Sequence, residues 1–66
     1  MKDAKRRDVE NFLKQQGYQV GRDKGRHTWW VKAGARSIPL PRHTKISAGV
    51  LRDIEKTIGH VPDAWK

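Results

Sequence analysis

The chain has 66 residues, and its 15 lysines and arginines exceed its 7 aspartates and glutamates to give a net charge of +8. It has no cysteine, which excludes disulfides and thiolate metal sites, and no apolar run near the roughly 18 residues of a membrane span. We therefore expect one cytoplasmic domain over residues 1–66 that attracts a polyanion. Nucleic acid is the first candidate partner, and an acidic protein is the alternative.

The first predicted element is a helix over residues 3–16. Asp3 is a candidate N-cap, because its carboxylate can accept from free backbone N–H groups. Gly17 stands where a left-handed C-cap is expected. The apolar stripe at helical spacing consists of Val9, Phe12 and Leu13.

Three strand-like segments follow, separated by the turn signals "DKG" and "AGA". The first, "GYQVGR", alternates apolar and polar residues, which predicts that Tyr18 and Val20 point inward. The second, "HTWWVK", is rich in β-forming residues. The third, "RSIPL", places Ile38 and Leu40 on one face. Pro39 has no N–H to donate, which favours an edge strand.

A second helix is predicted after the basic loop "PRHTK". Ser47 is its candidate N-cap, Gly59 its end, and Pro62 prevents its resumption. Its inner stripe consists of Val50, Leu51, Ile54 and Ile58. Residues 60–66 form a short tail with one aromatic residue, Trp65.

The predicted order is therefore helix, three strands, helix. Short loops favour an antiparallel meander, and two helices can cover one face of it while the other face stays open. This is an α+β fold with the α-β-β-β-α plan of a double-stranded-RNA-binding domain.

The middle strand presents alternate residues to its two faces. His27 and Trp29 share one face, and Thr28 and Trp30 share the other. Adjacent tryptophans cannot both enter the core, and the hydrophobic pattern alone does not decide which one does.

The segments "GRHTWW", "SIPLP" and "ISAGVLRDI" together resemble the HicA toxins of bacterial toxin–antitoxin pairs. The resemblance extends over about residues 4–59. The family signature has a glycine and a histidine in the middle strand with an aromatic residue three positions later, then a Pro-x-Pro segment and a helix that opens with glycine. The matching residues are Gly25, His27 and Trp30, then Ile38, Pro39 and Pro41, then Gly49, Leu51 and Ile54.

The resemblance implies a small ribonuclease of this fold that cleaves messenger RNA, stops translation, and is held inactive by a HicB antitoxin. His27 matches the catalytic histidine and Trp30 the buried aromatic residue, which would leave His27 and Trp29 on the open face. No metal or cofactor is implied. The expected RNA-binding residues are Arg22, Lys24, Arg26, Trp29, Arg42, His43 and Lys45.

Several alternatives stay open on the sequence. Trp29 is either a platform for stacked bases, an antitoxin contact, or a residue lying under Trp65. His43 is otherwise an ordinary loop histidine, and the cations at positions 5–7 are most simply a solvated helix face. The rival function is an RNA-binding module of the same fold that does not cut, and a third is an adaptor that docks only to a protein.

Overall fold

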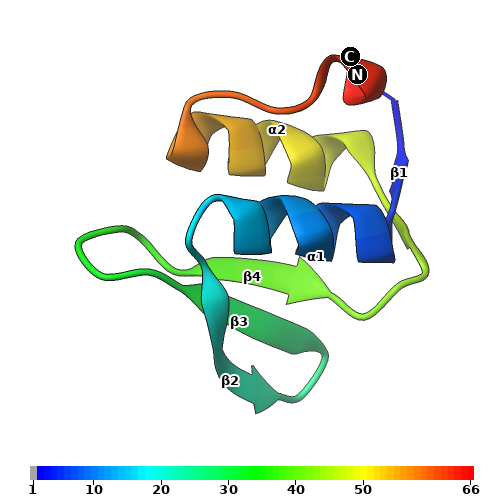
Figure 1. Ribbon diagram of the computed structural model, residues 1–66. Helices are drawn as coiled ribbons and strands as arrows, with labels where there is room; N and C mark the ends of the chain where they lie inside the picture. Colours follow the sequence, from blue (N-terminus) through cyan, green and yellow to red (C-terminus); the bar gives the residue numbers. More distant parts are fainter. Residues whose placement is uncertain (1) are drawn as a thin grey trace.

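The computed structural model describes residues 2–66, in an element order close to the predicted one (Figure 1). The elements are β1 (Ala4–Lys5), α1 (Arg6–Gln15), β2 (Gln19–Lys24), β3 (His27–Val31), β4 (Ile38–Pro41), β5 (Lys45–Ile46), α2 (Ala48–Ile58) and a 3-10 helix (Asp63–Trp65).

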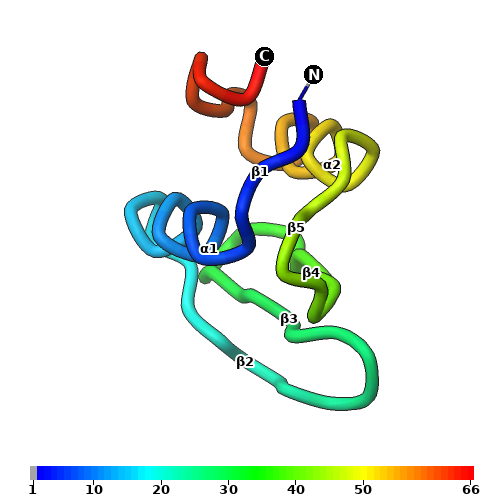
Figure 2. The backbone as a smooth tube through the Cα atoms, turned by 90° about the vertical axis from the view of Figure 1, so that its right-hand side faces the viewer, coloured from blue at the N-terminus to red at the C-terminus, as the bar shows by residue number. Residues whose placement is uncertain are grey.

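The main sheet is an antiparallel meander in the order β2-β3-β4. Both helices lie on the same side of it, as Figures 1 and 2 show from two directions. The other side is uncovered. The expected α+β fold of the double-stranded-RNA-binding-domain type is therefore confirmed, and β4 is an edge strand as Pro39 predicts.

The core lies between the helices and the covered face of the sheet. Both predicted helix stripes are in it, with Leu13 and Leu51 fully buried and Val50 and Ile58 packed at its border. Both predicted ends of the second helix are also correct. Gly59 adopts a left-handed φ of 103°, and the Ser47 hydroxyl accepts from the Val50 backbone N–H at 3.5 Å.

The start of the first helix differs from the prediction. α1 begins at Arg6, its N-cap residue is Lys5, and Asp3 does not cap it. The preceding residues instead form β1, which pairs antiparallel with β5, and the Arg6 N–H donates to the Thr44 carbonyl at 2.8 Å. Strand pairing thus provides the backbone partner that a carboxylate cap would have supplied.

Tyr18 is buried as predicted, whereas Val20 is 50% exposed and does not enter the core. Val20 pairs with Trp30, so it does project from the helix-covered face. However, β2 is an edge strand whose six residues are all exposed. Alternation identified the face correctly, but it carried no information on how far the helices reach.

The middle strand has the orientation that the resemblance implied. Thr28 and Trp30 are 5% and 1% exposed, whereas His27 and Trp29 are exposed on the uncovered face. The tail residue Trp65 is buried on the helix side, with its ring 5.2 Å from that of Phe12. Trp65 therefore does not cover Trp29, which removes one of the three interpretations of Trp29.

A bulge in β2 explains a glycine that the sequence does not single out. The β2–β3 register shifts between Val20 and Arg22. A Cβ added to the intervening Gly21 would lie 2.6 Å from both γ-methyl groups of Val31. The two strands approach too closely here for any side chain at position 21.

We expect Gly21→Ala to destabilise the protein by about 1–3 kcal/mol, the usual cost of overpacking. Thermal unfolding of this variant, of Val31→Ala and of the double variant would measure it. The double variant should be more stable than the sum of the single changes predicts, since Val31→Ala removes the clashing methyl groups. A Gly21→Ala protein as stable as the wild type would contradict the tight approach.

Candidate functional site

The uncovered face carries two rows of side chains across the three strands. Residues directly opposite each other in antiparallel strands project to the same face. One row comprises Lys24, His27 and Pro41, and the next comprises Arg22, Trp29 and Pro39. The structure therefore brings His27 and Trp29 together with two of the cations expected to bind RNA.

His27 is the first residue of β3 and follows directly on the Gly25–Arg26 turn. The turn requires a φ of 64° at Gly25, which suits glycine. His27 is exposed, and among residues 2–66 no hydrogen bond or ion pair engages its side chain. Its imidazole is thus accessible from the open face of the sheet.

A groove of about 260 Å³ lies beside His27, between the β4 edge and α2. Pro39 and Pro41 contribute apolar surface, and α2 contributes Asp53 and Thr57. Sequence analysis did not single out the polar pair on α2. Their only signal is that they lie off the apolar stripe of the helix, which is equally true of most surface residues.

Trp29 lies in a second shallow hollow, of about 430 Å³, together with Arg22, Gly21, Val31 and Ser37. Its indole is 37% exposed. An exposed aromatic ring beside a cation is the combination that binds a nucleobase and its phosphate at neighbouring points.

A series of side-chain hydrogen bonds joins α1, β3, β2 and the loop after β4. Arg6 Nη2 donates to Thr28 Oγ1 at 3.0 Å, and Thr28 Oγ1 donates to Asp23 Oδ1 at 3.2 Å. Arg42 forms an ion pair and a hydrogen bond with the same Asp23 oxygen. Asp23 was predicted only as part of a turn. Its opposition to Thr28 depends on strand register, which the sequence does not reveal.

The expected RNA-binding residues consequently fall into two groups. Arg22, Lys24 and Trp29 belong to β2 and β3 on the open face, with Arg26 in the adjoining turn. The others, Arg42, His43 and Lys45, belong to the β4–β5 segment, and Arg42 and Lys45 line a hollow beside α1. His43 is exposed but lines none of the hollows described here.

Neither a metal cluster nor a membrane-spanning helix is present in the part of the chain that the structure describes. Residues 2–66 contain no group of three or more His, Cys, Asp or Glu side chains that could hold a metal ion. No helix within the same residues is sufficiently long and apolar to traverse a bilayer.

The fold and the exposed basic and aromatic face define a small, basic domain of the double-stranded-RNA-binding-domain type. The family model of the HicA toxin of bacterial toxin–antitoxin systems matches residues 6–60, which is most of the chain. The chain therefore belongs to the HicA toxin family, and it is the toxin of a toxin–antitoxin pair. Comparison with curated proteins and with solved structures gave no match.

Proposed function

We propose that the protein is an endoribonuclease that cleaves messenger RNA in the cytoplasm without a metal, with His27 as general acid–base. The observation that carries this proposal is the position of His27. It is unpaired within residues 2–66, lies on the open face, and is flanked by Lys24 in the adjacent strand.

The chemistry needs few protein groups, because RNA carries its own nucleophile. His27 removes the proton of a 2′-hydroxyl, the 2′-oxygen bonds to phosphorus, and the bond from phosphorus to the 5′-oxygen breaks. The leaving 5′-oxygen takes up a proton from solvent, His27 returns its proton to solvent, and the products are a 2′,3′-cyclic phosphate and a 5′-hydroxyl end. Lys24 and Arg26 supply positive charge where the phosphate becomes more negative.

The antitoxin of the pair is proposed to be a HicB-like protein that covers the open face. That face exposes Trp29 and a row of cations, so an acidic partner with an apolar patch would complement it. Such a partner would compete with RNA for the same residues, which accounts for inhibition without a conformational change.

The direct test is incubation of purified protein with RNA in the presence of a metal chelator. Cleavage that leaves cyclic phosphate ends supports the proposal. Binding without cleavage would favour the rival, an RNA-binding module of the same fold. An absence of both cleavage and binding would indicate an adaptor that docks only to a protein.

RNA binding on the open face should combine a salt-dependent and a salt-independent contribution. In a cleavage-inactive His27→Ala background, we expect Arg22→Ala and Lys24→Ala each to reduce the log–log slope of affinity against salt by about 0.7. Trp29→Ala should lower affinity at every salt concentration and leave the slope unchanged, because stacking involves no released counterions. Fluorescence anisotropy with a labelled RNA would measure both. If neither Arg22→Ala nor Lys24→Ala altered the salt slope, electrostatic binding of RNA by β2 would be contradicted.

A further inference from the structure

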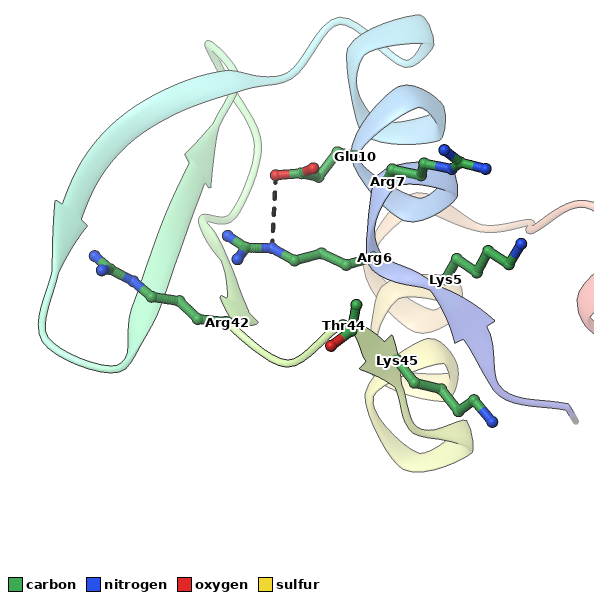
Figure 3. Close-up of a pocket in the computed structure, with 7 residues that line it drawn as sticks. All are labelled: Lys5, Arg6, Arg7, Glu10, Arg42, Thr44 and Lys45. Carbon is green, nitrogen blue, oxygen red and sulfur yellow. Dashed lines mark ion pairs between the residues drawn. The ribbon is translucent and has the colours of Figure 1, made fainter.

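A basic concavity lies between α1, β5 and the loop that follows β4 (Figure 3). Its volume is about 590 Å³. It is lined by Lys5, Arg6, Arg7, Glu10, Arg42, Thr44 and Lys45. On the sequence alone, the first three cations are most simply a solvated helix face, but the structure assembles them with two cations from a segment more than thirty residues away.

Two arginines of the concavity have partners within the protein. Arg6 donates to Thr28, and its Nε lies 3.6 Å from Glu10 Oε2. Arg42 is paired with Asp23. Figure 3 shows Arg6 and Arg42 on the sheet side of the concavity. Both side chains extend toward the sheet, away from the other three cations, and their guanidinium groups are engaged by these partners within the protein.

The other three cations are unpaired. Lys5, Arg7 and Lys45 are exposed, and no ion pair within residues 2–66 involves them. In Figure 3 they extend along the β1, β5 and α1 side of the concavity, away from Arg6. Positive charge therefore borders the concavity along its length instead of converging on one point.

The pairing of β1 with β5 makes this arrangement costly for the protein alone. Lys5 is the direct cross-strand partner of Lys45. Like charges directly opposite each other in antiparallel strands destabilise the pairing, and Glu10 is the one acidic residue that lines the concavity. A merely solvated surface gives no reason to place these two lysines opposite each other, whereas an anion bound beside them does.

We propose that this concavity binds the phosphate backbone of single-stranded RNA, at a site separate from the open-face residues around His27. The inference rests on the proposed ribonuclease function. A row of separated cations suits consecutive phosphates of a chain better than one free phosphate. Arginine also binds phosphate oxygens through paired N–H donors, and Arg7 is available for this because no ion pair within residues 2–66 involves it.

The location of the concavity links it to the cleavage site. Pro41, at the end of β4, is the cross-strand partner of His27, and the next residue is Arg42. A strand of RNA that passes His27 can therefore continue around the end of β4 to Arg42 and into the concavity. The concavity would hold RNA on one side of the scissile bond and raise affinity without taking part in the reaction.

The test compares two triple variants in the cleavage-inactive His27→Ala background. One changes Lys5, Arg7 and Lys45 to alanine. The matched control changes the exposed residues Lys14, Arg52 and Lys56 to alanine. These changes remove the same amount of positive charge at positions outside the concavity. The probe is a fluorescein-labelled single-stranded RNA of about twelve nucleotides, and affinity is measured by anisotropy across ionic strength.

We expect the concavity variant to lose about two units of the log–log salt slope, or 0.7 for each of three contacts, and about 10- to 100-fold in affinity at low salt. The control should lose much less. Equal losses in both variants would show a general charge effect and overturn the proposal. Unchanged RNA binding in the concavity variant would also overturn it and leave an acidic protein as the ligand of this surface.

Two further measurements distinguish the remaining explanations. The melting temperature of the concavity variant should equal or exceed that of its parent, since the change relieves the Lys5–Lys45 repulsion. A lower value would contradict that argument for the site. Millimolar inorganic phosphate should compete poorly with RNA, and full competition would replace the backbone site with a simple anion site.

The outcome is separable from that of the cleavage test. If wild-type protein binds but does not cut RNA and the concavity variant loses salt slope, the concavity is an RNA site and only the ribonuclease proposal fails. If wild-type protein cuts RNA and the concavity variant binds normally, the ribonuclease proposal stands and the concavity proposal is wrong.

Discussion

Replacing His27 by alanine should abolish RNA cleavage and relieve growth arrest when the protein is expressed in bacteria. Proton transfer by a positioned side chain typically contributes about 10²–10⁴-fold to a rate, and within residues 2–66 no other histidine belongs to β2, β3 or β4. His60 stacks edge-on against Phe12 at 5.6 Å on the helix side, and His43 belongs to the loop after β4. Cleavage of a labelled RNA, followed on a gel, is the direct measurement.

The variant should fold normally, because His27 is exposed and makes no hydrogen bond or ion pair within residues 2–66. His43→Ala is the matched control. It removes an exposed histidine a few residues beyond β4 and should retain most of the activity. A well-folded His27→Ala protein that still cleaves RNA and still arrests growth would exclude His27 as the acid–base.

The parts of the fold that the sequence predicts are those governed by local periodicity. The stripes on the two helices and the alternation in β3 follow from the 3.6-residue and two-residue repeats. Glycines with a left-handed φ end both helices. These features depend on neighbouring residues along the chain, so a single sequence contains the information needed to recognise them.

The parts that were missed depend on which segments meet in space. β1 and β5 have only two residues each, too few to show alternation. The series of hydrogen bonds from Arg6 through Thr28 and Asp23 to Arg42 joins residues up to 36 positions apart in the sequence. For the same reason, the sequence does not show that Arg42 and Lys45 lie beside α1, where both line one hollow.

The choice between the adjacent tryptophans shows where local pattern reaches its limit. Either facing of β3 satisfies strict alternation, since Trp29 and Trp30 are equally apolar. The family resemblance supplied the choice of Trp30, and the structure confirms it, with Trp30 1% and Trp29 37% exposed. The orientation of β3 also determines whether His27 is accessible. If Trp29 pointed inward, His27 on the same face of the strand would be buried with it.

Replacing Trp30 by alanine should therefore destabilise the protein by about 3–5 kcal/mol, the range for large aromatic truncations in a core. Native proteins are stable by only about 5–15 kcal/mol in total, and a chain this short is expected near the lower end. We expect Trp30→Ala to be largely unfolded at physiological temperature. Circular dichroism and urea denaturation are the measurements.

Two further variants test whether the loss of stability depends on which face of β3 points into the core. Trp29→Ala removes the same side chain from the open face and should cost about 1 kcal/mol or less, as partly exposed positions usually do. Trp30→Phe should cost less than Trp30→Ala. It keeps an aromatic ring in the core and removes an indole N–H that is buried without a hydrogen-bond partner in residues 2–66, a group that is unfavourable to bury. If Trp29→Ala proved the more damaging change, β3 would face the other way, and His27 would point toward the helices, where it could not reach RNA.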